Sequence, residues 1–116
     1  MPDKIIGRFY FKQTSNSNLI GEFSNDHSDR ILTESADLRD DSRKSRNGSS
    51  YIGDYYSTWQ EDGKPILADL TITAKPEGTN SNLFSLTWRR HGKPVFEGEA
   101  MLCDNILIGN YQSVEK

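Results

Sequence analysis

The clearest structural signal in the sequence is the segment 66–74, which reads ILADLTITA. Every second residue of this segment is apolar, and the residues between them include Asp69, Thr71 and Thr73. Successive side chains of a β-strand point to opposite faces, so the alternation predicts a strand with one apolar and one polar face. Such strands are typical of antiparallel sheets that place one face on the core and the other in water.

The same alternation recurs along the chain, between connections rich in turn-forming residues. We expect eight strands, near residues 4–13, 18–24, 30–38, 51–60, 65–75, 82–90, 94–102 and 105–112. Asp62-Gly63 and His91-Gly92 supply residues that tolerate the positive φ of tight hairpins. The connection from Arg39 to Ser50 is long and highly charged, and we expect a solvated, mobile loop there.

A repeat in the sequence bears on how these strands are arranged. Leu19-Ile-Gly-Glu-Phe23 recurs as Leu107-Ile-Gly-Asn-Tyr111, and both copies would flank the first strand if the last strand paired with the first. Closure of an even number of strands also removes both exposed sheet edges. We therefore predict an all-β fold, an eight-stranded antiparallel up-and-down barrel formed by a single domain over residues 1–116. A sandwich, or a half-barrel completed by dimerisation, is the alternative.

Composition excludes several classes of protein. The 116 residues carry a formal net charge of −3, which argues against nucleic acid or an anionic membrane as a partner. The single cysteine, Cys103, excludes an intrachain disulfide and favours a reducing compartment. We see no apolar segment typical of a signal peptide and none of membrane-spanning length. We expect a cytoplasmic protein, either a monomer or a homodimer.

Local sequence patterns resemble those of the calycin-type barrels, namely lipocalins, fatty-acid-binding proteins and avidin-like proteins. Phe84-Ser-Leu-Thr-Trp88 with Phe96-Glu-Gly98 is similar to the C-terminal hairpins of small lipocalin-like domains of unassigned role, and Gly7-Arg8-Phe9 is similar to the lipocalin first-strand Gly-x-Trp. Phe9 replaces the lipocalin tryptophan, and Gly109-Asn110-Tyr111 lacks the carboxylate clamp of the fatty-acid-binding branch. The resemblance implies a barrel that holds a small ligand, and we expect no cofactor.

Glu34 is the most informative polar residue. It shares a face with Leu32, Ala36 and Leu38, which places its carboxyl group inside the barrel. A buried carboxylate is costly unless it is paired or neutral, so Glu34 either orients a ligand or acts as an acid or base of raised pKa. Alternatively, it accepts a hydrogen bond from Tyr55 or Ser57. The candidate ligand-binding residues are Phe23, Glu34, Tyr55, Trp59, Trp88 and Tyr111.

The two histidines, His27 and His91, fall in predicted turns at the same end of the barrel, and we expect solvated turn residues and no metal site. The favoured function is non-enzymatic binding of a small, largely apolar molecule inside the barrel. One alternative is an isomerase or hydro-lyase with Glu34 as its catalytic acid or base. Another is a barrel filled by its own side chains that acts through its surface. We expect ligand entry beneath the 39–50 loop, because tight turns should close the opposite end.

Overall fold

A computed structural model describes residues 4–39, 51–75 and 82–114 of the chain. These residues form eight strands: β1 (Ile6–Gln13), β2 (Leu19–Asn25), β3 (Leu32–Leu38), β4 (Gly53–Glu61), β5 (Lys64–Ala74), β6 (Leu83–Arg90), β7 (Lys93–Cys103) and β8 (Ile106–Ser113). Within this part of the chain there is no helix with the length and apolar character needed to cross a membrane.

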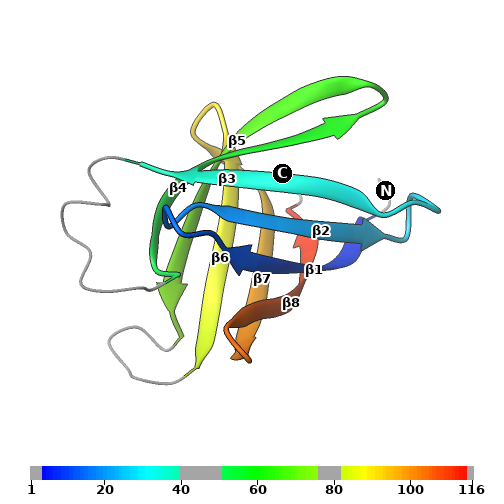
Figure 1. Cartoon of the computed structure of the whole chain (residues 1–116). Coiled ribbons are helices and arrows are strands. Elements are labelled where there is room, and N and C mark those ends of the chain that lie inside the picture. Colours follow the sequence, from blue (N-terminus) through cyan, green and yellow to red (C-terminus); the bar gives the residue numbers. More distant parts are fainter. Residues whose placement is uncertain (1–3, 40–50, 76–81, 115–116) are drawn as a thin grey trace.

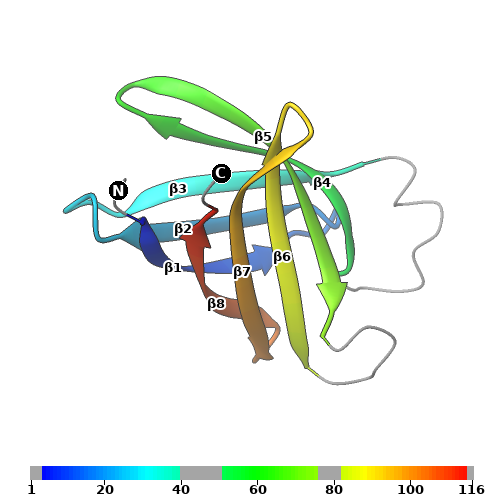
Figure 2. The same ribbon diagram turned by 180° about the vertical axis from the view of Figure 1, so that it is seen from behind.

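The strands form a closed antiparallel barrel. Each strand pairs with the next along the chain, and β8 pairs with β1 to close the sheet (Figures 1 and 2). The predicted all-β up-and-down barrel is therefore confirmed, and the sandwich and the half-barrel are excluded. The third strand begins at Leu32 rather than at the expected Arg30, which is exposed in the connection before it.

The alternation of apolar residues decides which face of each strand is buried. In β5, Ala68, Leu70 and Ile72 point into the barrel and are buried, whereas Leu67 and Asp69 point outward and are exposed. The same pattern holds for most of the other strands, and their inward side chains form one continuous core. An eight-stranded barrel has an interior just wide enough for side chains to fill, so this core occupies most of the space that the sheet encloses.

Both copies of the sequence repeat lie beside β1, as predicted. Leu19 and Leu107 are almost fully buried on the two strands that flank it. The glycine of each copy marks a close approach of two backbones. A Cβ at Gly21 would lie 1.9 Å from the carbonyl oxygen of Tyr10, and a Cβ at Gly109 would lie 2.0 Å from that of Glu99. The glycines of the repeat therefore allow β2 to lie close to β1 and β8 to lie close to β7.

Tyrosine side chains fill one end of the barrel. The Tyr51 hydroxyl lies 2.7 Å from the carbonyl oxygen of Asn105 and 3.2 Å from that of Phe11. The Tyr55 hydroxyl donates a hydrogen bond of 2.8 Å to the carbonyl oxygen of Tyr51. Both rings are buried, so they close the end of the barrel that adjoins the 39–50 connection. Residues 40–50 of that connection, where we predicted a mobile loop, lie outside the described residues.

The opposite end of the barrel is splayed. The pairing of β3 with β4 stops at Glu34 and Trp59, although both strands continue toward that end. Figure 1 shows the β4–β5 hairpin rising away from β3 beyond this point. A depression lies between the β2–β3 connection and the tip of the β4–β5 hairpin, bordered by Asp26, Arg30 and Glu61 among others. The two ends of the barrel thus differ. Side chains fill one end, and strands β3 and β4 separate at the other.

Replacing Leu70 by Ala should lower the free energy of unfolding by about 2–5 kcal/mol, because it removes a fully buried side chain and leaves a cavity. Leu67→Ala is the matched control, since Leu67 lies on the same strand with 67% of its surface exposed and should change stability by about 0.5 kcal/mol or less. Urea unfolding of the two variants measures both effects. Equal losses would contradict the assignment of the two faces of β5.

Candidate functional site

Glu34 on β3 is the only charged side chain that is buried among the described residues. Its Oε2 atom accepts a hydrogen bond from the Ser57 hydroxyl on neighbouring β4. The indole Nε1 of Trp88, on β6, donates a second hydrogen bond of 2.7 Å to the same oxygen. Within the described part of the chain, Oε1 receives no hydrogen bond. Both of these hydrogen bonds therefore hold Glu34 by the same carboxyl oxygen.

This arrangement follows in part from the sequence. The predicted interior position of Glu34 is confirmed, and so is the alternative in which Ser57 donates to it. Strand pairing places Ser57 directly opposite Ala36, two residues from Glu34 along β3, so the hydroxyl comes from the adjacent strand. Trp88 reaches Glu34 from a strand that does not pair with β3, and the alternation of residues predicts only that its side chain points inward.

The environment of Glu34 alters its acidity. Burial raises the pKa of the Glu34 carboxyl from its ordinary value of 4.5 to about 7, against the hydrogen bonds from Ser57 and Trp88, which lower it. Burial dominates because the charged form loses its hydration and gains only two donors. The carboxyl therefore changes its charge close to neutral pH.

Glu34 lines a small cavity of about 40 Å³. Six aromatic side chains, which we call the aromatic cluster, share its wall. They come from six different strands and are Phe9, Phe23, Trp59, Trp88, Phe96 and Tyr111. Ile5, Asn25 and Glu61 complete the lining. A water molecule needs about 10–15 Å³ of such space, so the cavity has room for about three waters or a few non-hydrogen atoms of a ligand.

The rings of the aromatic cluster pack edge to face. Phe96 and Tyr111 have ring centroids 5.4 Å apart with planes at 89°, and Phe9 and Trp88 have centroids 5.5 Å apart at 87°. This geometry places the positive edge of one ring on the negative face of the next. Gly7 makes room for the cluster, since a Cβ there would lie 2.6 Å from the Tyr111 ring.

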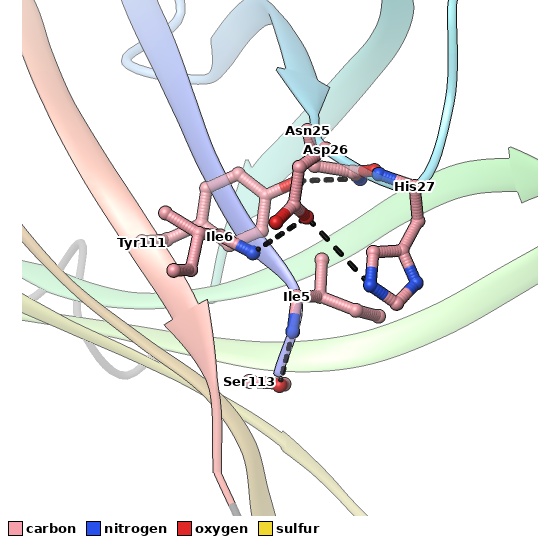
Figure 3. A network of polar contacts seen from close by, with 7 residues as sticks. All are labelled: Ile5, Ile6, Asn25, Asp26, His27, Tyr111 and Ser113. Carbon is pink, nitrogen blue, oxygen red and sulfur yellow. Dashed lines mark hydrogen bonds and ion pairs between the residues drawn. The ribbon is translucent and has the colours of Figure 1, made fainter. Parts of the chain in front are cut away.

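A network of hydrogen bonds holds the rim beside the cavity (Figure 3). Asn25 donates a 3.0 Å hydrogen bond to the Tyr111 hydroxyl, and Asp26 accepts one of 3.0 Å from the backbone N–H of Ile6. Nε2 of His27 lies 3.7 Å from the same Asp26 oxygen. The start of β1 is tied to the end of β8 by the hydrogen bond from the Ile5 N–H to the Ser113 hydroxyl. The β2–β3 connection is thereby fixed over the ends of β1 and β8.

The position of the cavity corrects our expectation about ligand entry. We expected entry beneath the 39–50 loop, but the cavity lies at the other end, next to the β2–β3 connection and the tip of the β4–β5 hairpin. We chose the wrong end of the barrel because the prediction relied on turn lengths, and turn lengths do not show which end the side chains fill. Tyr51 closes the end that has the long connection, and β3 and β4 part at the end that has tight turns.

The structure brings most of the predicted site residues together. Phe23, Glu34, Trp59, Trp88 and Tyr111 all line the cavity, whereas Tyr55 lies at the filled end and does not. The cavity also includes five residues that the sequence analysis did not select, which are Ile5, Phe9, Asn25, Glu61 and Phe96. Alternation of apolar residues in 5–11 and 96–102 places Phe9 and Phe96 on inward faces, so the sequence did carry a signal for these two rings. Nothing in the pattern marks Asn25 and Glu61, which end their strands.

In the described ranges, no group of three or more His, Cys, Asp or Glu side chains is arranged to hold a metal ion. His27 is paired with Asp26, and His91 occupies a tight turn with φ of 55°. Both histidines are exposed.

The chain matches no protein-family model, and searches of curated proteins and of solved structures find no significant match.

The raised pKa of Glu34 predicts a pH dependence of stability. A group whose pKa is higher in the folded state stabilises the fold below its unfolded pKa of 4.5, and this contribution is lost as pH rises through about 7. Because one pKa unit corresponds to about 1.4 kcal/mol, the free energy of unfolding should fall by about 3 kcal/mol over this range. The measurement is urea unfolding between pH 4 and pH 8 in the wild type and Glu34→Gln.

Glu34→Gln serves as the reference because the glutamine oxygen can still accept from Ser57 and Trp88 while its charge never changes. The free energy of unfolding of Glu34→Gln, measured relative to that of the wild type, should rise steadily from pH 4 to pH 8. Parallel pH profiles for the two proteins would contradict the raised pKa.

Proposed function

We propose that this protein is a calycin-like barrel that binds a small, largely apolar molecule in the cavity beside Glu34. The observation that carries the proposal is the meeting of a buried carboxyl group and the aromatic cluster in one cavity at the splayed end of the barrel. Ligand sites typically combine an apolar wall with a few polar groups that fix orientation. Here the apolar body would contact the aromatic rings, and a polar group would meet Oε1 of Glu34.

The size of the cavity limits the ligand. Sites for drug-sized molecules measure about 300–1,000 Å³, whereas this cavity measures about 40 Å³. A ligand of more than a few atoms must extend toward the rim or displace a side chain. Phe23 and Phe96 are only half-buried, so they are the rings of the cluster that can shift most easily. We infer that the ligand is small and that these two phenylalanines adjust to it.

The pKa of Glu34 supports a second candidate function, an isomerase or hydro-lyase in which Oε1 gives or takes a proton. A carboxyl group that titrates near pH 7 suits general acid–base catalysis. Incubation of the protein with a captured ligand in D2O distinguishes the two functions. Incorporation of deuterium at a carbon of the ligand supports the enzyme, and its absence supports binding alone.

Native mass spectrometry of freshly purified protein tests the binding function most directly. A copurifying small molecule of defined mass that dissociates on mild activation is the expected result. Its absence is then followed by titration with a defined probe.

The two tryptophans of the chain, Trp59 and Trp88, both line the cavity, so their fluorescence reports on its contents. Isobutanol should change this fluorescence saturably in the wild type. Phe23→Ala should enlarge the cavity by most of a phenyl ring and admit cyclohexanol, which the wild type should bind at least about tenfold more weakly. Ile20→Ala is the control, because Ile20 lies on the same strand with its side chain outward and 49% exposed.

Ile20→Ala should bind both alcohols as the wild type does. If isobutanol produces no saturable signal and Phe23→Ala gains no affinity for cyclohexanol, the binding proposal fails.

A further inference from the structure

The charges around the cavity have mainly one sign. Of the residues that line it, the charged ones are Glu34 and Glu61, and both are carboxylates. Trp59 holds Glu61 at the rim, because its indole Nε1 donates a 3.2 Å hydrogen bond to Oε1 of Glu61. The adjoining depression adds the carboxylates Asp26, Asp29 and Asp62, and its basic groups are Arg30 and His27. The residues that line the cavity and the depression thus include five carboxylates, one guanidinium and one imidazole.

Tyr111 reports the same negative field inside the cavity. Burial raises the pKa of its hydroxyl above the ordinary value of 10.0, while the hydrogen bond from Asn25 lowers it. The carboxylates of Glu34, Glu61 and Asp26 raise it further, because a second negative charge beside them is unfavourable. An anionic ligand would meet the same repulsion, and a cationic ligand would relieve it.

The aromatic cluster provides ring faces, the second kind of group that can bind an organic cation. The faces of Trp, Tyr and Phe rings carry negative charge and attract ammonium groups, most strongly where water is excluded. Trp59, Trp88 and Tyr111 are buried and line the same cavity as Glu34. Both donors to Glu34 end on Oε2, so Oε1 is left to accept a hydrogen bond from a ligand.

We propose that the ligand of this cavity is a small organic cation, an alkylammonium ion whose N–H groups meet Oε1 of Glu34 and whose alkyl body lies against the aromatic cluster. This inference rests on the proposed binding function and names the class of its ligand. The carboxylates of the depression attract the cation to the splayed end, and the aromatic rings replace the water that it loses on entry.

Three probes of similar size and different charge test the inference. They are isobutylammonium, isobutanol and isobutyrate, titrated at pH 8, where a primary alkylamine is still protonated and Glu34 is mostly charged. The readout is the pair of tryptophan indole N–H signals in ¹H–¹⁵N NMR spectra, because the Trp88 indole donates to Glu34 and the Trp59 indole donates to Glu61. We expect isobutylammonium to bind about tenfold or more tightly than isobutanol, and isobutyrate to bind weakest.

Glu34→Gln should remove most of this preference, lowering affinity for isobutylammonium about tenfold while changing affinity for isobutanol less than about twofold. Glu97→Gln is the matched control, since it removes the same charge from an exposed position on the outer face of β7. It should leave the affinities for all three probes unchanged. The comparison of the three probes on the wild-type protein stands even if a variant fails to fold.

The outcomes separate the two proposals. If isobutanol or isobutyrate binds as tightly as isobutylammonium, the cation inference is overturned and the binding function stands. If none of the three probes moves either indole signal, both proposals are overturned.

Discussion

The structure is constrained above all by a carboxyl group enclosed in an eight-stranded barrel. Closure of β8 onto β1 leaves an interior that side chains fill, and Glu34 is buried within it. Its charge is tolerated because Ser57 and Trp88 donate to one oxygen, which links β3 to β4 and to β6. These two bonds do not replace full hydration, so the carboxyl titrates close to neutral pH. The predicted pH dependence of stability and the proposed ligand chemistry both depend on this balance.

The asymmetry of the barrel explains where the cavity beside Glu34 lies. At one end the Tyr51 ring is buried and fills the space inside the barrel. Its hydroxyl lies close to two backbone carbonyl oxygens, so it is already engaged by the protein. At the other end β3 and β4 part beyond Glu34 and Trp59, and aromatic rings meet without filling the space completely. A register shift between β6 and β7 directly after Trp88 lies at this same end, where bulges commonly redirect side chains. The buried polar groups that surround Glu34 and the incompletely packed part of the interior therefore lie at the same end of the barrel.

Most of the fold could be predicted from the sequence because alternation is a local property. The pattern in 66–74 fixes which side chains of β5 are buried, and the same reasoning places Glu34 inside before any contact is known. The pairing of Glu34 with Trp88 could not be predicted, because it depends on which inward side chains meet across the interior. The prediction of the end at which a ligand enters was wrong for a related reason. Tyr51 closes one end of the barrel through contacts with Phe11 and Asn105, which lie far away in the sequence.

The buried Glu34 carboxyl changes its charge near neutral pH inside an aromatic cavity. The most direct measurement is the ¹³C chemical shift of the Glu34 side-chain carboxyl followed by NMR as a function of pH, with its signal identified by its loss in Glu34→Gln. Because burial raises the pKa of this carboxyl, we expect a titration midpoint at about 7. A midpoint near the ordinary value of 4.5 would show instead that the carboxyl is hydrated and that burial does not set its charge.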